Sequence, residues 1–428
     1  MGSNWKNLSG QDNWSNLLEP LDIDLRRYII HYGQMAQVTA DAFNSEKVSK
    51  HAGGCLYNRS NILSKVEFEQ GNPYKYKVTK YLYATSSVDL PSFLVNSLSR
   101  EAWSKESNWI GYVAVATEEG KVALGRRDIV IAWRGTSQTM EWLNDLKFDK
   151  VSAPDLFKGD RRVKIQHGWH SIYTTCDPKS SFIKSSAREQ VLEEVRRLIE
   201  LHKNENISVT IVGHSLGGAL ATLNAVDIVV NGYNNEFLVT AFVFGSPRVG
   251  DSSFKRFFNL LGDNIRVLRI ENASDVVPHY PLRTKMLCCL RNIGYSHVGK
   301  VVRIDTRKSS YLKQPGDVQK WHDLETYLHG IAGTHGDKGG FNLVVPRAIA
   351  LVNKNTDSLN DEFHVPGNWW VTKNKGMVRV ANGLWLLIDH EEEEDGGDVE
   401  LVVVDNGKHD HSDDVNDEKI VVDVGTSK

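Results

Sequence analysis

The chain has 428 residues, of which 40% are hydrophobic and 25% charged, a composition that is ordinary for a soluble globular protein and sufficient for a large core. The absence of any run of about eighteen apolar residues argues against a membrane-spanning helix, and the first residues lack the basic and apolar parts of a secretory signal. The net charge is only −3, and four cysteines are too few for a disulfide framework, so we expect reduced thiols and a cytoplasmic location.

The first third of the chain contains one helical and three strand-like patterns. A helix is expected within 21–43, and an alternating strand in 74–84. Two further strands, in 109–118 and 128–135, are expected on either side of a short charged turn at 119–127.

From residue 185 onwards, strand and helix patterns alternate. Ser186 and Glu189 form a capping box, which predicts the start of a helix. The expected order is a helix in 185–203, a strand before Ser215, a helix after it, a strand in 237–250, a helix in 252–261 and a strand in 264–275. This alternation predicts an α/β fold with a mainly parallel sheet flanked by helices, whose active groups lie beyond the carboxyl ends of the strands.

The stretch 210–221, TIVGHSLGGALA, places a serine between a buried strand and a helix rich in small residues. Ser215 has Gly213 two residues before it and Gly217 two residues after it, with His214 between strand and serine. A serine on a sharp strand-to-helix turn needs small neighbours at these two positions, and the turn exposes its Oγ. The pattern therefore predicts a nucleophile elbow; the alternative is a glycine-rich turn with an incidental serine.

A nucleophilic serine needs a base and an orienting carboxylate, which in this architecture follow it in the order acid, then histidine. Asp275 is expected at the end of the strand in 264–275, in a turn stiffened by Pro278 and Pro281. We predict that it is the orienting acid. Asp251 also follows a strand, but it can equally cap the next helix.

The base is sought among the histidines after Asp275. His322 stands where a loop meets a helix, which suits a base that must reach the serine. His329 is a rival two turns along the same helix face. His297 lies in a strand-like run, and His279 is too close to Asp275 in sequence to reach a separate serine. We predict His322.

The anion formed on acyl attack needs two hydrogen-bond donors. One is expected to be the backbone N–H of Leu216, directly after the nucleophile. The other is expected at Thr136, where Gly135 permits a tight bend. The next segment, 137–148, is amphipathic and forms either an ordinary helix or a lid, with the apolar side chains of Met140, Trp142, Leu143 and Phe148.

Charge is divided unevenly along the chain. Residues 389–428 carry fifteen acidic side chains against three lysines, a balance of −12 that leaves +9 for residues 1–388. We expect a single α/β domain with an N-terminal extension in 1–388 and an acidic, flexible tail in 389–428, whose two apolar runs can pair as strands or bind a partner. The basic body suits a peripheral contact with an anionic membrane surface, although scattered solvating lysines explain it as readily; no nucleic-acid partner is expected.

Six segments, taken in order, resemble the class 3 lipases, which have the α/β-hydrolase fold. They are IAWRGT at 131–136, HGWHSIY at 167–173, IVGHSLGGALA at 211–221, FVFGSPRVGD at 242–251, ENASDVVPHYP at 271–281 and WHDLETYLHGIAG at 321–333. The resemblance covers roughly residues 110–330, and the stretch 346–370 extends it towards plant cytosolic phospholipase A1 proteins.

The resemblance implies a role for each candidate residue: Ser215 as nucleophile, Asp275 as orienting acid, His322 as base. Thr136 would then be an oxyanion donor. It also implies a phospholipase A1 that releases the sn-1 fatty acid from phospholipids such as phosphatidylcholine, without metal or cofactor. The alternatives are a lipase for neutral lipids or galactolipids, and a non-catalytic lipase-like signalling scaffold, against which the full set of three residues argues. The sequence departs from the family in a lengthened loop at 282–292, where Cys288 and Cys289 have no assigned role.

Overall fold

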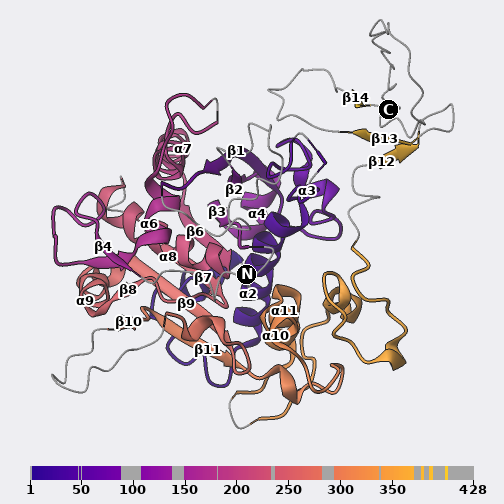
Figure 1. Ribbon diagram of the computed structural model, residues 1–428. Helices are drawn as coiled ribbons and strands as arrows, with labels where there is room; N and C mark the ends of the chain where they lie inside the picture. Colours follow the sequence, from indigo (N-terminus) through magenta and orange to yellow (C-terminus); the bar gives the residue numbers. More distant parts are fainter. Residues whose placement is uncertain are drawn as a thin grey trace, which may run out of the picture.

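The computed structural model describes most of the chain between residues 2 and 370 (Figure 1). The described ranges are 2–46, 48–49, 51–87, 108–136, 149–180, 182–232, 237–281, 294–336 and 339–370, together with three short strands at 377–379, 385–388 and 401–402. The segment 137–148, expected to be a helix or a lid, both adjacent cysteines and most of the acidic tail lie outside these ranges. None of the described helices is long and apolar enough to cross a membrane.

Seven described strands form the central sheet, in the order β1-β2-β3-β6-β7-β9-β11. Their bounds are β1 Tyr76–Ala84, β2 Asn108–Ala116, β3 Arg127–Trp133, β6 Ile207–His214, β7 Val239–Phe244, β9 Ile265–Asn272 and β11 Lys300–Ile304. The pairs β1–β2 and β2–β3 are antiparallel, and the remaining four pairs are parallel. The prediction of a mainly parallel sheet is confirmed.

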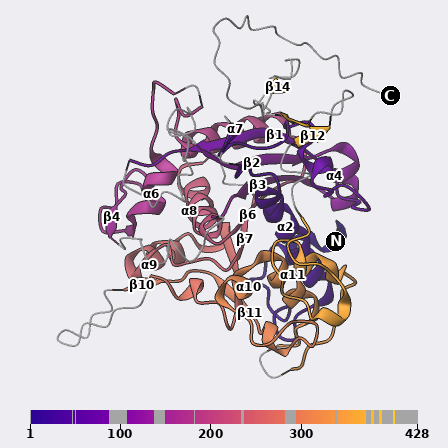
Figure 2. The same ribbon diagram turned by 45° about the vertical axis from the view of Figure 1, so that its right-hand side comes forward.

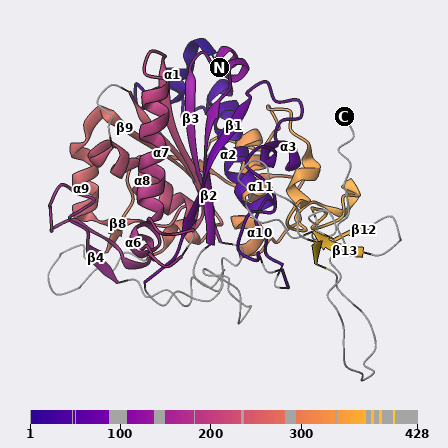
Figure 3. The same cartoon turned by 90° about the horizontal axis from the view of Figure 1, so that it is seen from above.

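Helices cover both faces of this sheet, as the view in Figure 3 shows. On one face lie α6 His167–Thr174, α7 Ala187–Leu201, α8 Leu216–Asn231 and α9 Ser252–Leu260; on the other lie α2 Ile23–Asp41 and α11 Leu324–Gly333. Successive residues of β3 alternate between two apolar cores, with Ile131 in the first and Val130 in the second. The sheet is therefore buried on both sides, as a parallel sheet requires.

The remaining described elements are short. The helices are α1 Trp5–Leu8, α3 Ile62–Lys65, α4 Glu118–Leu124 and α10 Val318–His322, with 3₁₀ turns at Gly2–Asn4, Gly262–Asn264, Val277–His279, Thr306–Lys308, Ile349–Asn353 and Asp361–Phe363. A second sheet has the order β10-β8-β5-β4, formed by Tyr295–Ser296, Gly250–Asp251, Lys164–Gln166 and Lys150–Ser152. A third joins β12 Met377–Arg379, β13 Trp385–Ile388 and β14 Leu401–Val402, so one apolar run of the predicted tail pairs as a strand.

The prediction of a turn at 119–127 was wrong: this segment contains most of helix α4. The side chain of Thr117 accepts a hydrogen bond from the N–H of Gly120 and caps the helix, and Glu118 and Glu119 suit its positive N-terminal end. Gly125, at φ 71°, ends it in the left-handed conformation. With only seven residues, the helix has too few apolar positions to show a helical period.

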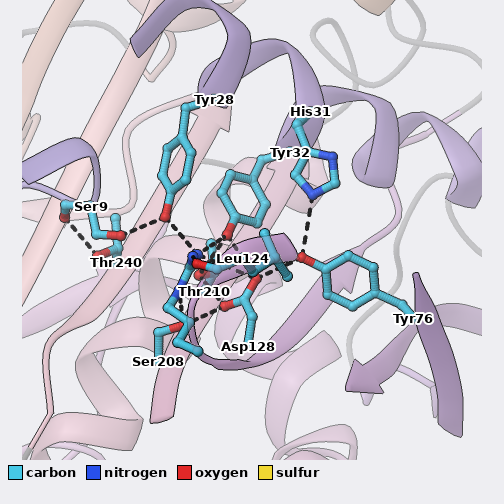
Figure 4. Close-up of polar contacts among 11 residues, drawn as sticks. Ser9, Tyr28, His31, Tyr32, Tyr76, Leu124, Asp128, Ser208, Thr210 and Thr240 are labelled. Carbon is cyan, nitrogen blue, oxygen red and sulfur yellow. Dashed lines mark hydrogen bonds and ion pairs between the residues drawn. The ribbon is translucent and has the colours of Figure 1, made fainter. Parts of the chain in front are cut away.

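Helix α2 is tied to the sheet by buried polar contacts at the amino ends of β3 and β6 (Figure 4). Asp128 accepts hydrogen bonds from the hydroxyls of Tyr32, Tyr76, Ser208 and Thr210. The fully buried guanidinium of Arg126 lies 3.7 Å from the same carboxylate and also donates to Tyr28 and Tyr32. This network lies at the end of β6 opposite Ser215.

The same helix is also joined to α11, which lies beside it in Figures 1 and 2. Buried Arg26 donates to the main-chain oxygens of Ile331 and Thr334, 305 and 308 residues further along the chain. Helix α2, near the start of the chain, is therefore hydrogen-bonded to the end of α11, near the end of the described domain.

Candidate active site

Ser215 lies on a strained turn between β6 and α8. Its φ of 57° and ψ of −125° are rare for a residue with a side chain and cost of order 1–3 kcal/mol. A Cβ at Gly213 would stand 2.1 Å from the oxygen of Gly217, and one at Gly217 would stand 2.2 Å from the oxygen of Trp133. Only glycine fits at either position, which is the steric reason given for the predicted elbow.

Asp275 and His322 are in direct contact. Nδ1 of His322 lies 2.6 Å from Oδ2 of Asp275, and both residues are almost fully buried. In this hydrogen bond Nδ1 donates and the carboxylate oxygen accepts, so Nδ1 carries a proton. Oδ1 accepts from the N–H of Val277, which leaves the carboxylate little freedom to turn. The prediction that Asp275 ends its strand was wrong: β9 ends at Asn272, three residues before it.

His214, the residue before the serine, holds the main chain of His322. Its Nε2 lies 2.7 Å from the carbonyl oxygen of His322, and the two rings are 4.5 Å apart. Burial, and to a lesser extent the neighbouring His322, lower the pKa of His214 well below its usual range. His214 is therefore neutral and donates from Nε2 to the carbonyl. This contact joins the predicted nucleophile to the predicted base through one residue.

Three polar atoms of the predicted site are buried and have no hydrogen-bond partner among the described residues: Oγ of Ser215, Nε2 of His322 and Oγ1 of Thr136. Buried polar atoms are nearly always paired, so each unpaired one needs an explanation, and in an active site that explanation is a bound substrate or reacting group. Thr136 follows β3, Ser215 follows β6 and Asp275 follows β9. These residues therefore lie at the carboxyl ends of strands in the parallel part of the sheet, in which β7 separates β6 from β9.

Two glycines bring these groups together. Gly245 follows β7 with φ 55°, and a Cβ there would lie 3.1 Å from both Nδ1 of His322 and Oδ2 of Asp275. A Cβ at Gly135 would lie 2.8 Å from the oxygen of His214 and 3.4 Å from Cβ of Ser215. The loop that carries Thr136 thus passes directly against the serine.

The other candidates have different surroundings. Nε2 of His329 lies 2.8 Å from the hydroxyl of Ser309, and burial lowers its pKa to about 3. His297 is hydrogen-bonded to the main-chain oxygen of Pro278. Asp251 caps α9 by accepting from the N–H groups of Ser253 and Phe254. The structure therefore brings Asp275 to His322, and gives His329, His297 and Asp251 local partners.

Two residues of the site, Tyr327 and Asn272, were not predicted from the sequence. The hydroxyl of Tyr327 donates to Oδ2 of Asp275 at 2.5 Å and accepts from the N–H of Asn272. The Asn272 side chain also donates to the main-chain oxygen of Trp321, next to the predicted base. Tyr327 follows His322 by five residues, but no spacing rule connects that position to the acid.

The described part of the chain also contains a cavity of about 390 Å³ between α2, the loop at 66–74 and the segment 345–370. None of Ser215, Asp275 and His322 lines it. Within the described residues, no group of three or more His, Cys, Asp or Glu side chains is arranged to hold a metal ion.

Comparison with known proteins assigns the family. The model of Lipase (class 3) matches residues 130–285. Phospholipase A1-IIgamma of Arabidopsis thaliana is 54% identical over 400 residues, covering 90% of this chain and 93% of that protein. Phospholipase A1-II 1 of Oryza sativa subsp. indica is 49% identical over 393 residues, covering 91% and 97%.

The chain belongs to the class 3 lipase family. As a class 3 lipase it is a lipase-type carboxylic ester hydrolase, its fold is the α/β-hydrolase fold, and its substrate is a lipid. Among solved structures, the Lip2 lipase of Yarrowia lipolytica is 18% identical, with 67% of this chain and 81% of that chain covered and a TM-score of 0.43.

Proposed function

We propose that this class 3 lipase is a phospholipase A1 that hydrolyses the sn-1 ester of phospholipids such as phosphatidylcholine through an acyl-enzyme on Ser215. The substrate class is supported by relatives named phospholipase A1-II, whose sequences align with about nine tenths of this chain. The observation that carries the mechanism is the 2.6 Å hydrogen bond between His322 and Asp275, with Nε2 of the histidine left unpaired among the described residues.

In the proposed reaction, Oγ of Ser215 attacks the carbonyl carbon of the ester while Nε2 of His322 accepts the hydroxyl proton. Asp275 holds the proton on Nδ1 and stabilises the imidazolium as it forms. When the tetrahedral adduct collapses, the bond to the glycerol oxygen breaks and His322 returns the proton to that oxygen, which releases a lysophospholipid. Water then attacks the acyl-serine by the same route and releases the fatty acid.

The negative charge of the tetrahedral adduct needs preorganised donors. We assign them to the N–H of Leu216, at the start of α8, and to Thr136, through its N–H and hydroxyl. The first N–H groups of a helix have no acceptor within the helix, which supports the first assignment. The buried and unpaired Oγ1 of Thr136, beside a loop that touches Ser215, supports the second.

Two alternatives differ in substrate or in chemistry. A lipase for neutral lipids or galactolipids would use the same residues, and the names of the relatives favour phospholipids over these substrates. A non-catalytic scaffold would give no reason to keep both a strained serine and a buried, unpaired histidine nitrogen, so these two observations favour catalysis.

We further propose that the enzyme is cytoplasmic and binds membranes peripherally. The +9 balance of residues 1–388 supports attraction to anionic lipids, and the acidic stretch 389–428 would oppose it. In this proposal residues 1–388 form one α/β-hydrolase domain.

The test is hydrolysis of phosphatidylcholine labelled separately in its sn-1 and sn-2 chains. Release of the sn-1 label, abolished by Ser215→Ala, is the expected result. Preferential release of the sn-2 label would contradict A1 specificity. Faster hydrolysis of a triacylglycerol or galactolipid at equal lipid concentration would favour the first alternative, and absence of hydrolysis of all three would favour the scaffold.

A further inference from the structure

Arg134 connects the end of β3 to the loop that carries Thr136. Its Nε donates to the main-chain oxygen of Trp109 at 2.8 Å, and one terminal nitrogen donates to the oxygen of Gly135 at 3.0 Å. The guanidinium also lies 3.7 Å from the ring centre of Phe43. These contacts hold the side chain from three sides, and only 6% of the residue is exposed.

The hydrogen bond to Gly135 has a consequence for the next residue. The oxygen of Gly135 and the N–H of Thr136 belong to one planar trans peptide, in which they point in opposite directions. Fixing the oxygen therefore also fixes the direction of the Thr136 N–H, the group assigned above to the oxyanion hole. The same peptide is close to the serine loop, because Gly135 packs against His214 and Ser215.

Among the described residues Arg134 makes no ion pair, although it is buried. Burial lowers its pKa to about 9, so the side chain is still a cation at neutral pH. A buried guanidinium is normally paired with a carboxylate. Here its described partners are two carbonyl oxygens and an aromatic ring, and its positive charge remains available to a negative charge that forms nearby.

We propose that Arg134 is a positioning residue of the oxyanion hole: it orients the Gly135–Thr136 peptide through the Gly135 oxygen and supplies an unneutralised positive charge behind it. This inference rests on the proposed function, since it assumes that the adduct on Ser215 is stabilised at Thr136. In this proposal Arg134 stabilises the transition state and does not contribute to substrate binding, so its replacement should change kcat.

The test compares Arg134→Met and Arg134→Lys with the parent enzyme on a soluble p-nitrophenyl ester and with a p-nitrophenyl alkylphosphonate. The phosphonate places an oxygen in the oxyanion hole when the serine displaces p-nitrophenolate from phosphorus. Arg134→Met should lower kcat by about ten- to a hundredfold, somewhat less than the loss of an oxyanion donor itself, with KM within about threefold. Phosphonylation should slow by the same factor.

Arg134→Lys keeps the charge but cannot hold two carbonyl oxygens with one planar fork, so it should recover part of the lost kcat. The matched control is Arg26→Met, which removes another buried arginine that donates to main-chain oxygens, between α2 and α11. It should lower the midpoint of thermal unfolding while kcat per folded molecule stays within about twofold.

Several outcomes would overturn the inference. One is a folded Arg134→Met with parental kcat, another is a fall in kcat that merely follows the folded fraction, and a third is a rise in KM at constant kcat. If Ser215→Ala is inactive and Arg134→Met is not impaired, the inference alone is wrong. If Ser215→Ala stays active, both the proposed function and the inference that rests on it are wrong.

Discussion

The hydroxyl of Tyr327 lies 2.5 Å from Oδ2 of Asp275, the same carboxylate oxygen that accepts from Nδ1 of His322. Two donors from α10 and α11 thus meet at one oxygen beyond the end of β9. The other carboxylate oxygen of Asp275, Oδ1, accepts from the N–H of Val277, so both oxygens are held. We expect it to determine how well the acid aligns the base.

Tyr327→Phe should therefore lower kcat on a soluble ester about three- to tenfold, because the carboxylate loses a donor but keeps its hydrogen bond to the histidine. The free energy of unfolding should fall by about 1–2 kcal/mol. Steady-state kinetics and urea unfolding measure the two effects. Tyr311→Phe, in the ring contact with His329, is the control and should leave kcat unchanged. An unaltered kcat in Tyr327→Phe would show that the tyrosine hydroxyl contributes only to stability and not to catalysis.

Ser215→Ala should abolish ester hydrolysis, with a loss on the order of a millionfold in turnover, because the nucleophile is removed from a set of residues that act together. The fold should persist, since the serine oxygen makes no hydrogen bond to the described residues. Activity is measured on labelled phosphatidylcholine and folding by circular dichroism. Hydrolysis near the parental rate would exclude Ser215 as the nucleophile.

His322→Ala should reduce turnover about as severely as the serine substitution. His329→Ala and His297→Ala should keep most of the activity, because their nitrogens bind Ser309 and a main-chain oxygen. The three variants are compared by kcat at equal folded concentration. If His329→Ala is inactive while His322→Ala is not, the base has been assigned to the wrong histidine, although the reaction class survives.

Stability should fall as the pH drops below 6.5, because burial lowers the pKa of His329 from 6.5 to about 3. A histidine with a depressed folded-state pKa stabilises the protein fully above its unfolded pKa, and this contribution is lost as protons bind the unfolded chain. Between pH 6.5 and 5 one such residue accounts for roughly 1.5 kcal/mol. In urea unfolding at both pH values, His329→Gln should lose less stability than the parent; an equal loss would contradict the assignment.

Asp128→Asn should destabilise the protein by about 3–5 kcal/mol, because it removes the buried charge that Arg126 and four hydroxyls face. The kcat of the folded fraction should not change, since the network lies at the other end of the sheet. Asp263→Asn is the control: its carboxylate pairs with Arg266 but is almost fully exposed, so its loss should cost less than 1 kcal/mol. Denaturant unfolding at neutral pH compares the two.

Removal of residues 389–428 should strengthen binding to anionic vesicles by deleting a charge of −12, and the gain should shrink as salt reduces the screening length towards and below about 10 Å. Hydrolysis of soluble esters should stay the same. Co-sedimentation of both proteins at low and high salt measures the effect. Equal binding at low salt would identify the tail as an inert solubilising segment.

Features that depend on neighbouring residues could be predicted from the sequence. The capping box of Ser186 and Glu189 forms at the start of α7 as expected, and the glycines around Ser215 have the close contacts that the elbow requires. The parallel sheet followed from the alternation of strand and helix patterns along the chain. Helix α4 was not predicted because its sequence contains an N-terminal capping residue but no helical periodicity of apolar residues.

Contacts between distant segments could not be predicted. Tyr327 and Asp275 are 52 residues apart, and His214 and His322 are 108 apart, so neither hydrogen bond leaves a local pattern. Arg134 is one of many arginines until the fold places its side chain against Gly135. The order rule predicts Asp275 and His322 because topology constrains which strands end near Ser215, whereas no such rule covers the residues that orient them.

The bond between Arg26 and the main chain of Ile331 and Thr334 affects how the protein is made. At about 5–20 residues per second, a ribosome needs roughly 15–60 s to proceed from one partner to the other. During that time α2 has been synthesised but its partner helix has not, and the strands that it covers appear only gradually. The nascent chain must keep the apolar face of α2 from aggregating, so cells that synthesise this lipase should depend on chaperones that bind its N-terminal segment until α11 leaves the ribosome.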